Sequence, residues 1–441
     1  MTRPLQWLVI LSLLAAGRLG AEFRSQDVTV RRLDNGLKIL LHEDHDIPNI
    51  AYYTFYRVGS RNERPGLTGV SHFIEHMMFN GSAAFGPGEF DRIMEFNGGA
   101  NNAYTSDDLT AYTDWFPKAA LEKMMKMESD RMRGLLFDPQ VLESERGVIA
   151  SERRLGVEND NDSLLDETVR ATAIMAHPYH WGVIGWMSDI LSWKRDEINA
   201  YFRTYYAPNN AVLVVAGDFE TEAIMALIQK YYGDIPSAPP PPAVATVEPP
   251  QIGTRRVQLR KAAQIPSFQA VYHVPAVSHA DFPALSLLDR ILLNGESSRL
   301  YRRLVSEAQL AISVSGGISQ TIDPFLFYIQ VKPRPGADLD LLERTIAEEL
   351  AKVQESGVSS IEMEKAVNSV RTGFYAPLQT IAGKANMLGF TEVVFGGFEN
   401  LFTVMDRFAA VTPAQVQEAC RKYLNRDNQT VGTLIPAGGA Q

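Results

Sequence analysis

The sequence predicts an α+β protein built from two similar units, each a β-sheet packed against helices. A proline-rich stretch, IPSAPPPPAVATVEPP at 235–250, separates two halves of the 441-residue chain. The halves repeat motifs at a constant spacing of 218 residues: DIPNIAYYTFY precedes QIPSFQAVYHV, and YFRTYYAPNNAVLVV precedes ACRKYLNRDNQTVGT. A chain of this length exceeds one ordinary core, and equal offsets at two distant places favour a duplication.

The first half opens with β-strand patterns. Branched and aromatic residues fill VTVRRL (28–33), LKILLHED (37–44) and IAYYTFYRV (50–58), and Asp34-Asn35-Gly36 supplies a turn between the first two. Helical periodicity then runs through 67–79, 89–98, 118–136 and 141–155, and AVLVVAGD at 211–218 returns to strand. The second half shows the same order of strands and helices.

The N-terminal segment 1–21 has the plan of a secretory signal, with Arg3, an apolar run over 5–16, and the small residues Gly20 and Ala21. An uncleaved anchor is the competing interpretation, but the run is shorter than the ~20 residues that span a bilayer. No other segment is long and apolar enough to cross a membrane. We therefore expect an exported protein, most simply periplasmic, without a stable membrane span after cleavage.

Charge and cysteine content exclude other classes. The formal net charge of −10 disfavours nucleic acid as a partner, because binding to phosphates requires a basic surface. Cys420 is the single cysteine, so neither an internal disulfide nor a cysteine-rich zinc site is possible.

The run GVSHFIEHMMF carries the strongest chemical signal. In a helix, His72, Glu75 and His76 share one face, so two imidazoles can hold one ion. Hydrolytic zinc sites take three protein ligands and keep a position for water. Glu75 could accept a proton as general base or could itself ligate, and helix geometry leaves both roles open. A core helix without a metal is the alternative, but burying three ionisable groups together costs several kcal/mol.

A third ligand is expected from a separate helix. The stretch QVLESERGVIASERRLGVEND offers Glu143, Glu145 and Glu152 within an amphipathic pattern. Glu145 and Glu152 are seven residues apart and lie on the same helical face. One of them could bind the metal while the other supports a metal ligand from behind.

This arrangement resembles the pitrilysin and insulinase family of zinc peptidases, in its short two-domain bacterial type, whose inverted motif reads His-x-x-Glu-His. Family members carry the ligand glutamate about 75 residues beyond the second histidine in a segment like ERxVVxxE. Here ERGVIASE ends at Glu152. The resemblance implies one Zn²⁺ per chain held by His72, His76 and Glu152, with Glu75 as general base and Glu145 as the supporting carboxylate.

A second similarity concerns substrate binding. In NGGANNAYTSDDLTAY, Asn102 and Ala103 match an Asn-Ala pair with which the family holds the substrate backbone on an exposed strand edge. An edge strand has unpaired N–H and C=O groups, so an added peptide strand gains affinity with little demand on its side chains. The resemblance thus implies peptides or unfolded segments, bound in extended form, as substrates.

One departure from the family pattern points to a partner. Active members that work alone, and silent partner subunits, carry an Arg and a Tyr seven residues apart in the later half. The corresponding positions in SSRLYRRLVSEAQLAISVSGG are Val305 and Ile312, and neither side chain donates a hydrogen bond. Since oxyanion donors are worth about 2.7 to 4 kcal/mol each, we expect a homologous subunit to supply the Arg and Tyr across a shared chamber. That assembly would be a heterodimer, with a homodimer also possible.

The second half does not repeat the metal motif, because ALSLLDRILLNGESS aligns Ser286, Asp289 and Arg290 with it. We therefore expect a signal peptide at 1–21, a catalytic zinc-binding domain at 22–234, a linker at 235–250 and a degenerate second domain at 251–441. The predicted function is a zinc-dependent endopeptidase. A noncatalytic structural or peptide-binding subunit of the same fold is the alternative.

Overall fold

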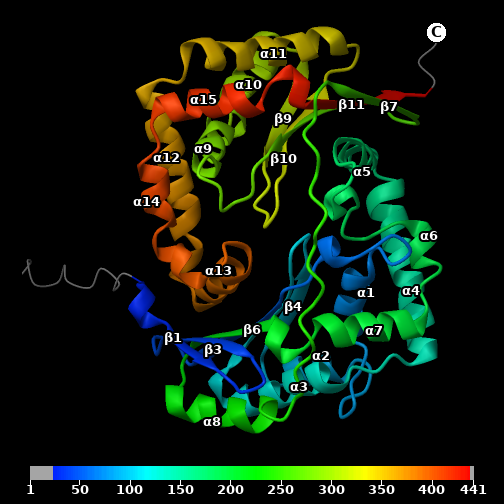
Figure 1. The fold of residues 1–441 in the computed structure, drawn as a ribbon, viewed down its shortest axis with the longest axis vertical. Coiled ribbons are helices and arrows are strands. Elements are labelled where there is room, and N and C mark those ends of the chain that lie inside the picture. The colour runs from blue at the N-terminus through cyan, green and yellow to red at the C-terminus, as the bar shows by residue number, and fades with distance from the viewer. Residues whose placement is uncertain (1–22, 438–441) are drawn as a thin grey trace, which may run out of the picture.

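The computed structural model describes residues 23–437, so the predicted signal segment lies outside the described residues. Two mixed β-sheets are packed against helices (Figure 1). The first sheet has the strand order β1-β2-β6-β3-β5-β4, and β4 forms one edge. Its strands are β1 Thr29–Arg32, β2 Lys38–Glu43, β3 Asn49–Tyr56, β4 Ala100–Thr105, β5 Thr110–Pro117 and β6 Ala211–Gly217. Neighbouring strands are antiparallel except for the parallel pair β2 and β6.

The second sheet repeats this connectivity. Its order is β7-β11-β8-β10-β9, with β7 and β11 parallel and the other pairs antiparallel. The strands are β7 Arg255–Lys261, β8 Ser267–Val274, β9 Ala311–Ile318, β10 Phe325–Pro333 and β11 Gln429–Pro436. Within the described range, β1 has no counterpart in this sheet. The matching orders confirm the predicted α+β class and the two similar units.

Helices of the first half are α1 Val70–Met77, α2 Glu89–Phe96, α3 Leu121–Gly134, α4 Pro139–Arg153, α5 Asn161–Ala173, α6 Met187–Ile190, α7 Arg195–Tyr205 and α8 Thr221–Tyr232. Those of the second half are α9 Phe282–Leu293, α10 Arg299–Tyr301, α11 Leu339–Ser356, α12 Ser360–Tyr375, α13 Ile381–Val394, α14 Val404–Ala409 and α15 Pro413–Tyr423. The segments predicted at 67–79, 89–98, 118–136 and 141–155 correspond to α1 through α4.

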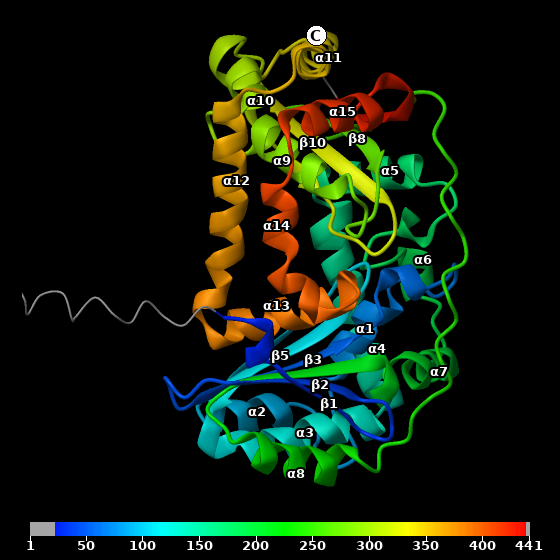
Figure 2. The ribbon, with the colours of Figure 1, turned by 60° about the vertical axis from the view of Figure 1, so that its left-hand side comes forward.

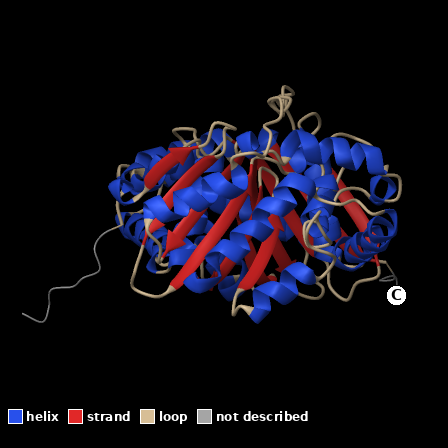
Figure 3. Ribbon diagram, turned by 90° about the horizontal axis from the view of Figure 1, so that it is seen from below, coloured by secondary structure: helices blue, strands red, loops and turns tan. Residues whose placement is uncertain are grey.

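The first sheet is covered on both faces, which explains its nearly continuous apolar strands. Successive side chains of a strand point to opposite faces. Ile50 and Tyr52 of β3 therefore join a core cluster with residues of α1, α3, α7 and α8, while Ala51 and Phe55 join another cluster with α13. Seen from below, helices lie across the strands (Figure 3). Burial on both faces accounts for the absence of polar alternation in β6.

Each half lends a helix to the sheet of the other half. Leu165 and Val169 of α5 pack with residues of the second sheet, and Leu388 of α13 packs with residues of the first. The two helices occupy equivalent places in the repeat, and both lie between the sheets in Figures 1 and 2. At the α13 contact, a Cβ on Gly389 would lie 2.0 Å from a ring carbon of Phe55. The halves are therefore joined by shared hydrophobic cores.

Residues 233–254, which include the proline-rich stretch, contain neither helix nor strand. The segment runs along the outside of the molecule, in green at the right of Figure 2. Glu248 anchors it by accepting hydrogen bonds from the backbone N–H groups of Met175 and Ala176, both at 2.8 Å. Among residues 23–437, no helix combines the length and the apolar content needed to cross a bilayer.

Candidate functional site

Helix α1 is short, and buried groups fix its N-terminus. Gly69, which caps the helix, has a φ of 84°, and a Cβ there would lie 2.3 Å from the carbonyl oxygen of Ile184. Glycine is required at this position for both reasons. The Glu63 carboxylate accepts hydrogen bonds from the N–H groups of Gly69 at 2.7 Å and Ser71 at 2.8 Å. These bonds satisfy donors that the first helical turn leaves free, and they hold α1 in one orientation.

One face of α1 is buried and the other carries the ionisable residues. Phe73, Ile74 and Met77 are inaccessible to solvent and belong to the first core cluster. On the opposite face the rings of His72 and His76 meet edge to face, with centroids 4.7 Å apart. The helix is therefore amphipathic, with one face packed into the core and the other carrying the ionisable side chains.

Glu152 of α4 completes a three-residue donor set. One ligand atom from each of His72, His76 and Glu152 can be chosen so that all three lie within 4.8 Å of one another. Nε2 of His76 is 3.6 Å from Oε2 of Glu152. Two imidazole nitrogens and one carboxylate oxygen converging at this spacing can hold a divalent metal ion.

His72 is held in the neutral form. Burial, together with the neighbouring His76, lowers the pKa of His72 to about 4, so its imidazole is neutral near pH 7. Nδ1 of His72 is buried and has no hydrogen-bond partner among the described residues. A neutral imidazole with an uncommitted nitrogen is the form that ligates metals. The residues present therefore fit a metal such as zinc.

His76 lies between two carboxylates. Burial acts to lower the pKa of His76, but the hydrogen bond with Glu145 and the charge of Glu152 outweigh it, and the pKa is raised. The same hydrogen bond is the main reason that the pKa of Glu145 is lowered. Without a metal, the carboxylates therefore favour a proton on His76, and a bound cation would take that proton's place.

Glu145 is held against the back of His76. Its Oε1 is 2.7 Å from Nδ1 of His76, and its Oε2 accepts a hydrogen bond from Asn80 at 2.9 Å. Asn80 also donates to the carbonyl oxygen of His76 at 3.1 Å. Asn80, which follows α1 in a turn, was not identified from the sequence.

Helix α4 presents its three glutamates differently. Asp138 caps the helix by accepting from the N–H groups of residues 140 and 141, and Arg146 ties it to the backbone oxygen of Trp193 at 2.8 Å. Glu143 is exposed and pairs with Arg146 at 3.1 Å. Glu145 and Glu152 reach His76, whereas Glu143 is not part of the site.

Glu75 is beside the donor set but does not belong to it. Its Oε2 accepts a hydrogen bond from the Thr105 hydroxyl of β4 at 2.6 Å. Burial raises the pKa of Glu75, while the Thr105 hydrogen bond and the charge of His76 act in the opposite direction. Thr105 was not identified from the sequence, since its contact with Glu75 depends on how the sheet is placed against α1.

Asn102 and Ala103 lie on the edge strand β4. Its inner side pairs with β5, where Asn102 is opposite Thr113 and Ala103 is opposite Tyr112. The Asn102 side chain accepts a hydrogen bond from the N–H of Ala103 at 2.9 Å. An edge that adjoins α1 offers backbone groups to an added strand.

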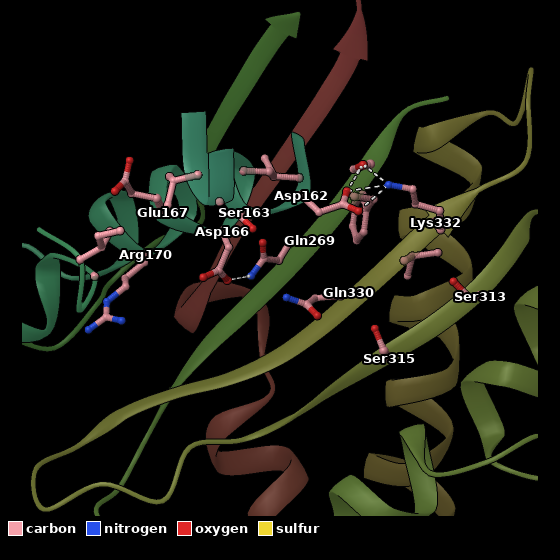
Figure 4. Close-up of a pocket in the computed structure, with 18 of the residues that line it drawn as sticks. Asp162, Ser163, Asp166, Glu167, Arg170, Gln269, Ser313, Ser315, Gln330 and Lys332 are labelled. Carbon is pink, nitrogen blue, oxygen red and sulfur yellow. Dashed lines mark hydrogen bonds and ion pairs between the residues drawn. The ribbon is translucent and has the colours of Figure 1, made fainter. Parts of the chain in front are cut away.

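A cavity of about 530 Å³ lies between α5 and strands β8, β9 and β10 (Figure 4). Its lining begins at Gly156 and Val157, just beyond the end of α4 that carries Glu152. Asp162 accepts hydrogen bonds from Lys332 at 2.7 Å and from Ser267 at 2.6 Å. The lining includes none of His72, His76 and Glu152, so this cavity is separate from the donor set.

The positions aligned with the family's Arg and Tyr lie in the second half. Val305 is in a π-helical turn at 302–307, and Ile312 is on β9 with 49% of its surface exposed. The nearby arginines are already engaged: Arg299 forms two hydrogen bonds with Glu362, and Arg303 pairs with Glu307. Arg302 also pairs with Glu307, so all three of these arginines have a carboxylate partner among the described residues.

Two matches to known protein families together cover most of the chain. Residues 38–184 match the family described as Insulinase (Peptidase family M16). Residues 192–370 match the domain described as Peptidase M16 inactive domain. The first range contains His72, His76 and Glu152. The second range contains α9, where the histidines of the motif are replaced.

The two Helicobacter pylori matches are covered over nearly their whole length, whereas PqqL is covered over about half. The Zinc protease PqqE from Helicobacter pylori is 29% identical over 428 residues, which are 95% of this chain and 96% of that protein. The crystal structure of a protease from Helicobacter pylori has a TM-score of 0.89 at 28% identity, over 93% of this chain and 99% of that one. The periplasmic protease PqqL from Escherichia coli shares the fold, with a TM-score of 0.77 at 19% identity, over 94% of this chain and 48% of that one.

Proposed function

The chain belongs to the insulinase family of peptidases, and from this premise we propose that it is a zinc-dependent endopeptidase acting on peptides or unfolded segments. The observation that carries the proposal is the convergence of His72, His76 and Glu152, with Glu75 on the same helix as the two histidines. Structural ion clusters rarely leave a buried imidazole nitrogen without a partner, as at Nδ1 of His72.

The proposed roles follow from the contacts. His72, His76 and Glu152 would hold one zinc ion, which supplies a Lewis acid that acidifies water and polarises a carbonyl group. Glu75 would accept a proton from the attacking water and return it to the leaving nitrogen. Its raised pKa suits this exchange, because a base must also be able to act as an acid. Glu145, held by Asn80, would orient His76.

The substrate would bind as an additional strand. The edge of β4 at Asn102 and Ala103 lies beside α1, so an extended peptide that displaces the Asn102 side chain from the Ala103 N–H could pair there with its scissile bond near the metal site. Folded proteins cannot offer a free strand, so we expect them to be poor substrates.

We also propose the domain organisation that the sequence predicts. The catalytic zinc-binding domain would comprise residues 22–234, the linker 235–250 and the degenerate second domain 251–441. In this second domain, Ser286, Asp289 and Arg290 occupy α9. The exchange of α5 and α13 implies that neither domain is stable by itself, because each would lose one cover of its sheet.

We further propose that a homologous subunit completes the enzyme. Val305 and Ile312 supply no hydrogen-bond donor, and the neighbouring arginines are paired. The fold of this chain accounts for 48% of the PqqL chain, a ratio that fits two such folds working together there. A heterodimer enclosing a chamber is the favoured arrangement, with a homodimer as the second possibility.

Export is proposed from the N-terminal sequence and is supported by one relative. Residues 1–21 have the composition of a secretory signal, and the fold is shared with a protease named periplasmic. We propose the periplasm as the location.

The competing proposal is a noncatalytic subunit that binds peptides or serves assembly. The pair Val305 and Ile312 favours it, whereas the intact set of His72, Glu75, His76 and Glu152 favours catalysis. Cleavage of an unstructured peptide should be measured with the chain alone and with homologous candidate partners, with and without a zinc chelator. Chelator-sensitive cleavage in either preparation supports the enzyme. Zinc-loaded protein that cleaves nothing in any mixture supports the noncatalytic subunit.

A further inference from the structure

Thr105 connects the edge strand to the catalytic helix. Along β4, Ala103 packs against the core cluster that contains α1 residues, whereas Tyr104 packs against the cluster that contains α13. Side chains two residues apart share a face of a strand, so Thr105 points to the α1 side with Ala103. Its hydroxyl lies 2.6 Å from Oε2 of Glu75.

The single hydroxyl proton of Thr105 is directed to Glu75. The other nearby oxygen, Oγ1 of Thr110, is 3.5 Å away, and Thr110 donates its own proton to the carbonyl oxygen of Val58 at 2.9 Å. A carboxylate accepts such a bond strongly, because hydrogen bonds to an ionised group are shorter and stronger than neutral ones.

We propose that Thr105 is a positioning residue for the general base. Helix geometry lets Glu75 either ligate or act as a base, and the Thr105 hydrogen bond holds its carboxylate outside the set formed by His72, His76 and Glu152. Because Thr105 follows Asn102 and Ala103 on the same strand, the base is oriented by the strand that is proposed to pair with substrate. The inference rests on the proposed function and adds a residue to it.

Thr105→Val and Thr105→Ser distinguish the contribution of the Thr105 hydroxyl from that of its side-chain packing. Valine keeps the β-branched shape and removes the donor, whereas serine keeps the donor. We expect Thr105→Val to lower kcat by about tenfold or more with KM nearly unchanged, and Thr105→Ser to stay within about threefold of the natural protein. Thr204→Val, on α7, is the matched control, because the Thr204 hydroxyl bonds only the carbonyl oxygen of Ala200 among the described residues.

Zinc retention provides a second readout. In Thr105→Val the Glu75 carboxylate loses the hydroxyl bond and is less firmly held away from the metal, so the variant should hold zinc against a chelator at least as firmly as the natural protein. Turnover gives a further test. When Glu75→Gln is already present, adding Thr105→Val should lower kcat little further, because Thr105 is proposed to act only through Glu75.

Three results would overturn the inference: unchanged kcat in Thr105→Val, an equal loss in Thr105→Ser, or weakened zinc binding in Thr105→Val. These outcomes differ from failure of the proposed function, which would appear as absence of chelator-sensitive cleavage by the natural protein in every mixture.

Discussion

His76 and Glu145 form a hydrogen bond in which Nδ1 of the imidazole lies 2.7 Å from Oε1 of the carboxylate. The other ring nitrogen, Nε2, is 3.6 Å from Glu152. A neutral imidazole donates through one nitrogen and accepts through the other. Once a cation has displaced the second proton, Glu145 would select the tautomer with the proton on Nδ1 and leave the lone pair of Nε2 available as a ligand beside Glu152. The two carboxylates come from one helix, seven residues apart, and assume different roles.

Removing Glu145 should weaken metal binding without removing a ligand. We expect Glu145→Ala to lower zinc affinity by about 10- to 100-fold, because His76 loses the group that fixes its orientation. Competition with a chromogenic chelator measures this affinity. Glu143→Ala is the control, since Glu143 lies on the same helix and pairs only with Arg146 among the described residues. Equal zinc affinity in both variants would contradict the role given to Glu145.

Glu75→Gln should separate chemistry from metal binding. The amide keeps the size of the side chain and cannot accept the proton, so turnover should fall by several orders of magnitude while the zinc content stays that of the natural protein. Peptide cleavage and metal analysis on the same preparation test this. Normal turnover would exclude Glu75 as the base, and loss of zinc would make it a ligand.

Gly389 should be sensitive to a single methyl group. Its Cβ would lie 2.0 Å from the Phe55 ring, so Gly389→Ala must shift α13 from the first sheet, at a cost of about 1 to 3 kcal/mol. Gly373→Ala on α12 is the control, because a Cβ there meets nothing within 4 Å and alanine favours a helix. Denaturant unfolding of both variants gives the comparison. A stabilised Gly389→Ala would mean that the close contact is absent.

Glu392 joins α13 to Lys38 and Arg57 of the first half, and the stability that this contact provides should depend on pH. Burial acts to raise the pKa of Glu392, but hydrogen bonds from Lys38 at 2.7 Å and Arg57 at 2.8 Å outweigh it, and the pKa is lowered. A lowered folded-state pKa stabilises the protein above the ordinary carboxyl pKa, and that stability is lost as the pH falls through the folded value.

We therefore expect Glu392→Gln to destabilise the protein at pH 7 by about 2 kcal/mol, less than for a fully buried pair because Arg57 is partly exposed. The gap should narrow at a pH well below the ordinary carboxyl pKa, where the natural carboxylate also becomes neutral. Unfolding at both pH values measures it, with exposed Glu364→Gln as control. A gap of constant size would show that the charge of Glu392 is not what stabilises the contact.

Features that depend on residues close together in the chain could be predicted from the sequence. Helices α1 to α4 have clear 3.6-residue patterns, and the strand β3 and its copy β8 could be aligned by the repeat. The spacing of Glu145 and Glu152 also placed both on one helical face. These features depend on residues close together in the chain, so periodicity was enough to find them.

Features that depend on long-range packing were missed. Helix α13 is buried on several sides because it lies between the first sheet and other segments of the second half, so it lacks the single apolar stripe of a surface helix. The packing of α5 on the second sheet and of α13 on the first sheet likewise cannot be predicted from local sequence patterns. Thr105 and Asn80 reach the site only through the placement of β4 and the turn after α1.

The central claim is that one metal ion is held jointly by α1 and α4, and metal analysis of the purified chain tests it most directly. Protein prepared with zinc and freed of loosely bound metal should contain about one zinc per chain. Single replacements His76→Ala and Glu152→Ala, which act from different helices, should each abolish this stoichiometric zinc while Glu143→Ala retains it. A folded natural chain that takes up no zinc, or a Glu152→Ala variant that keeps the full amount, would contradict the account.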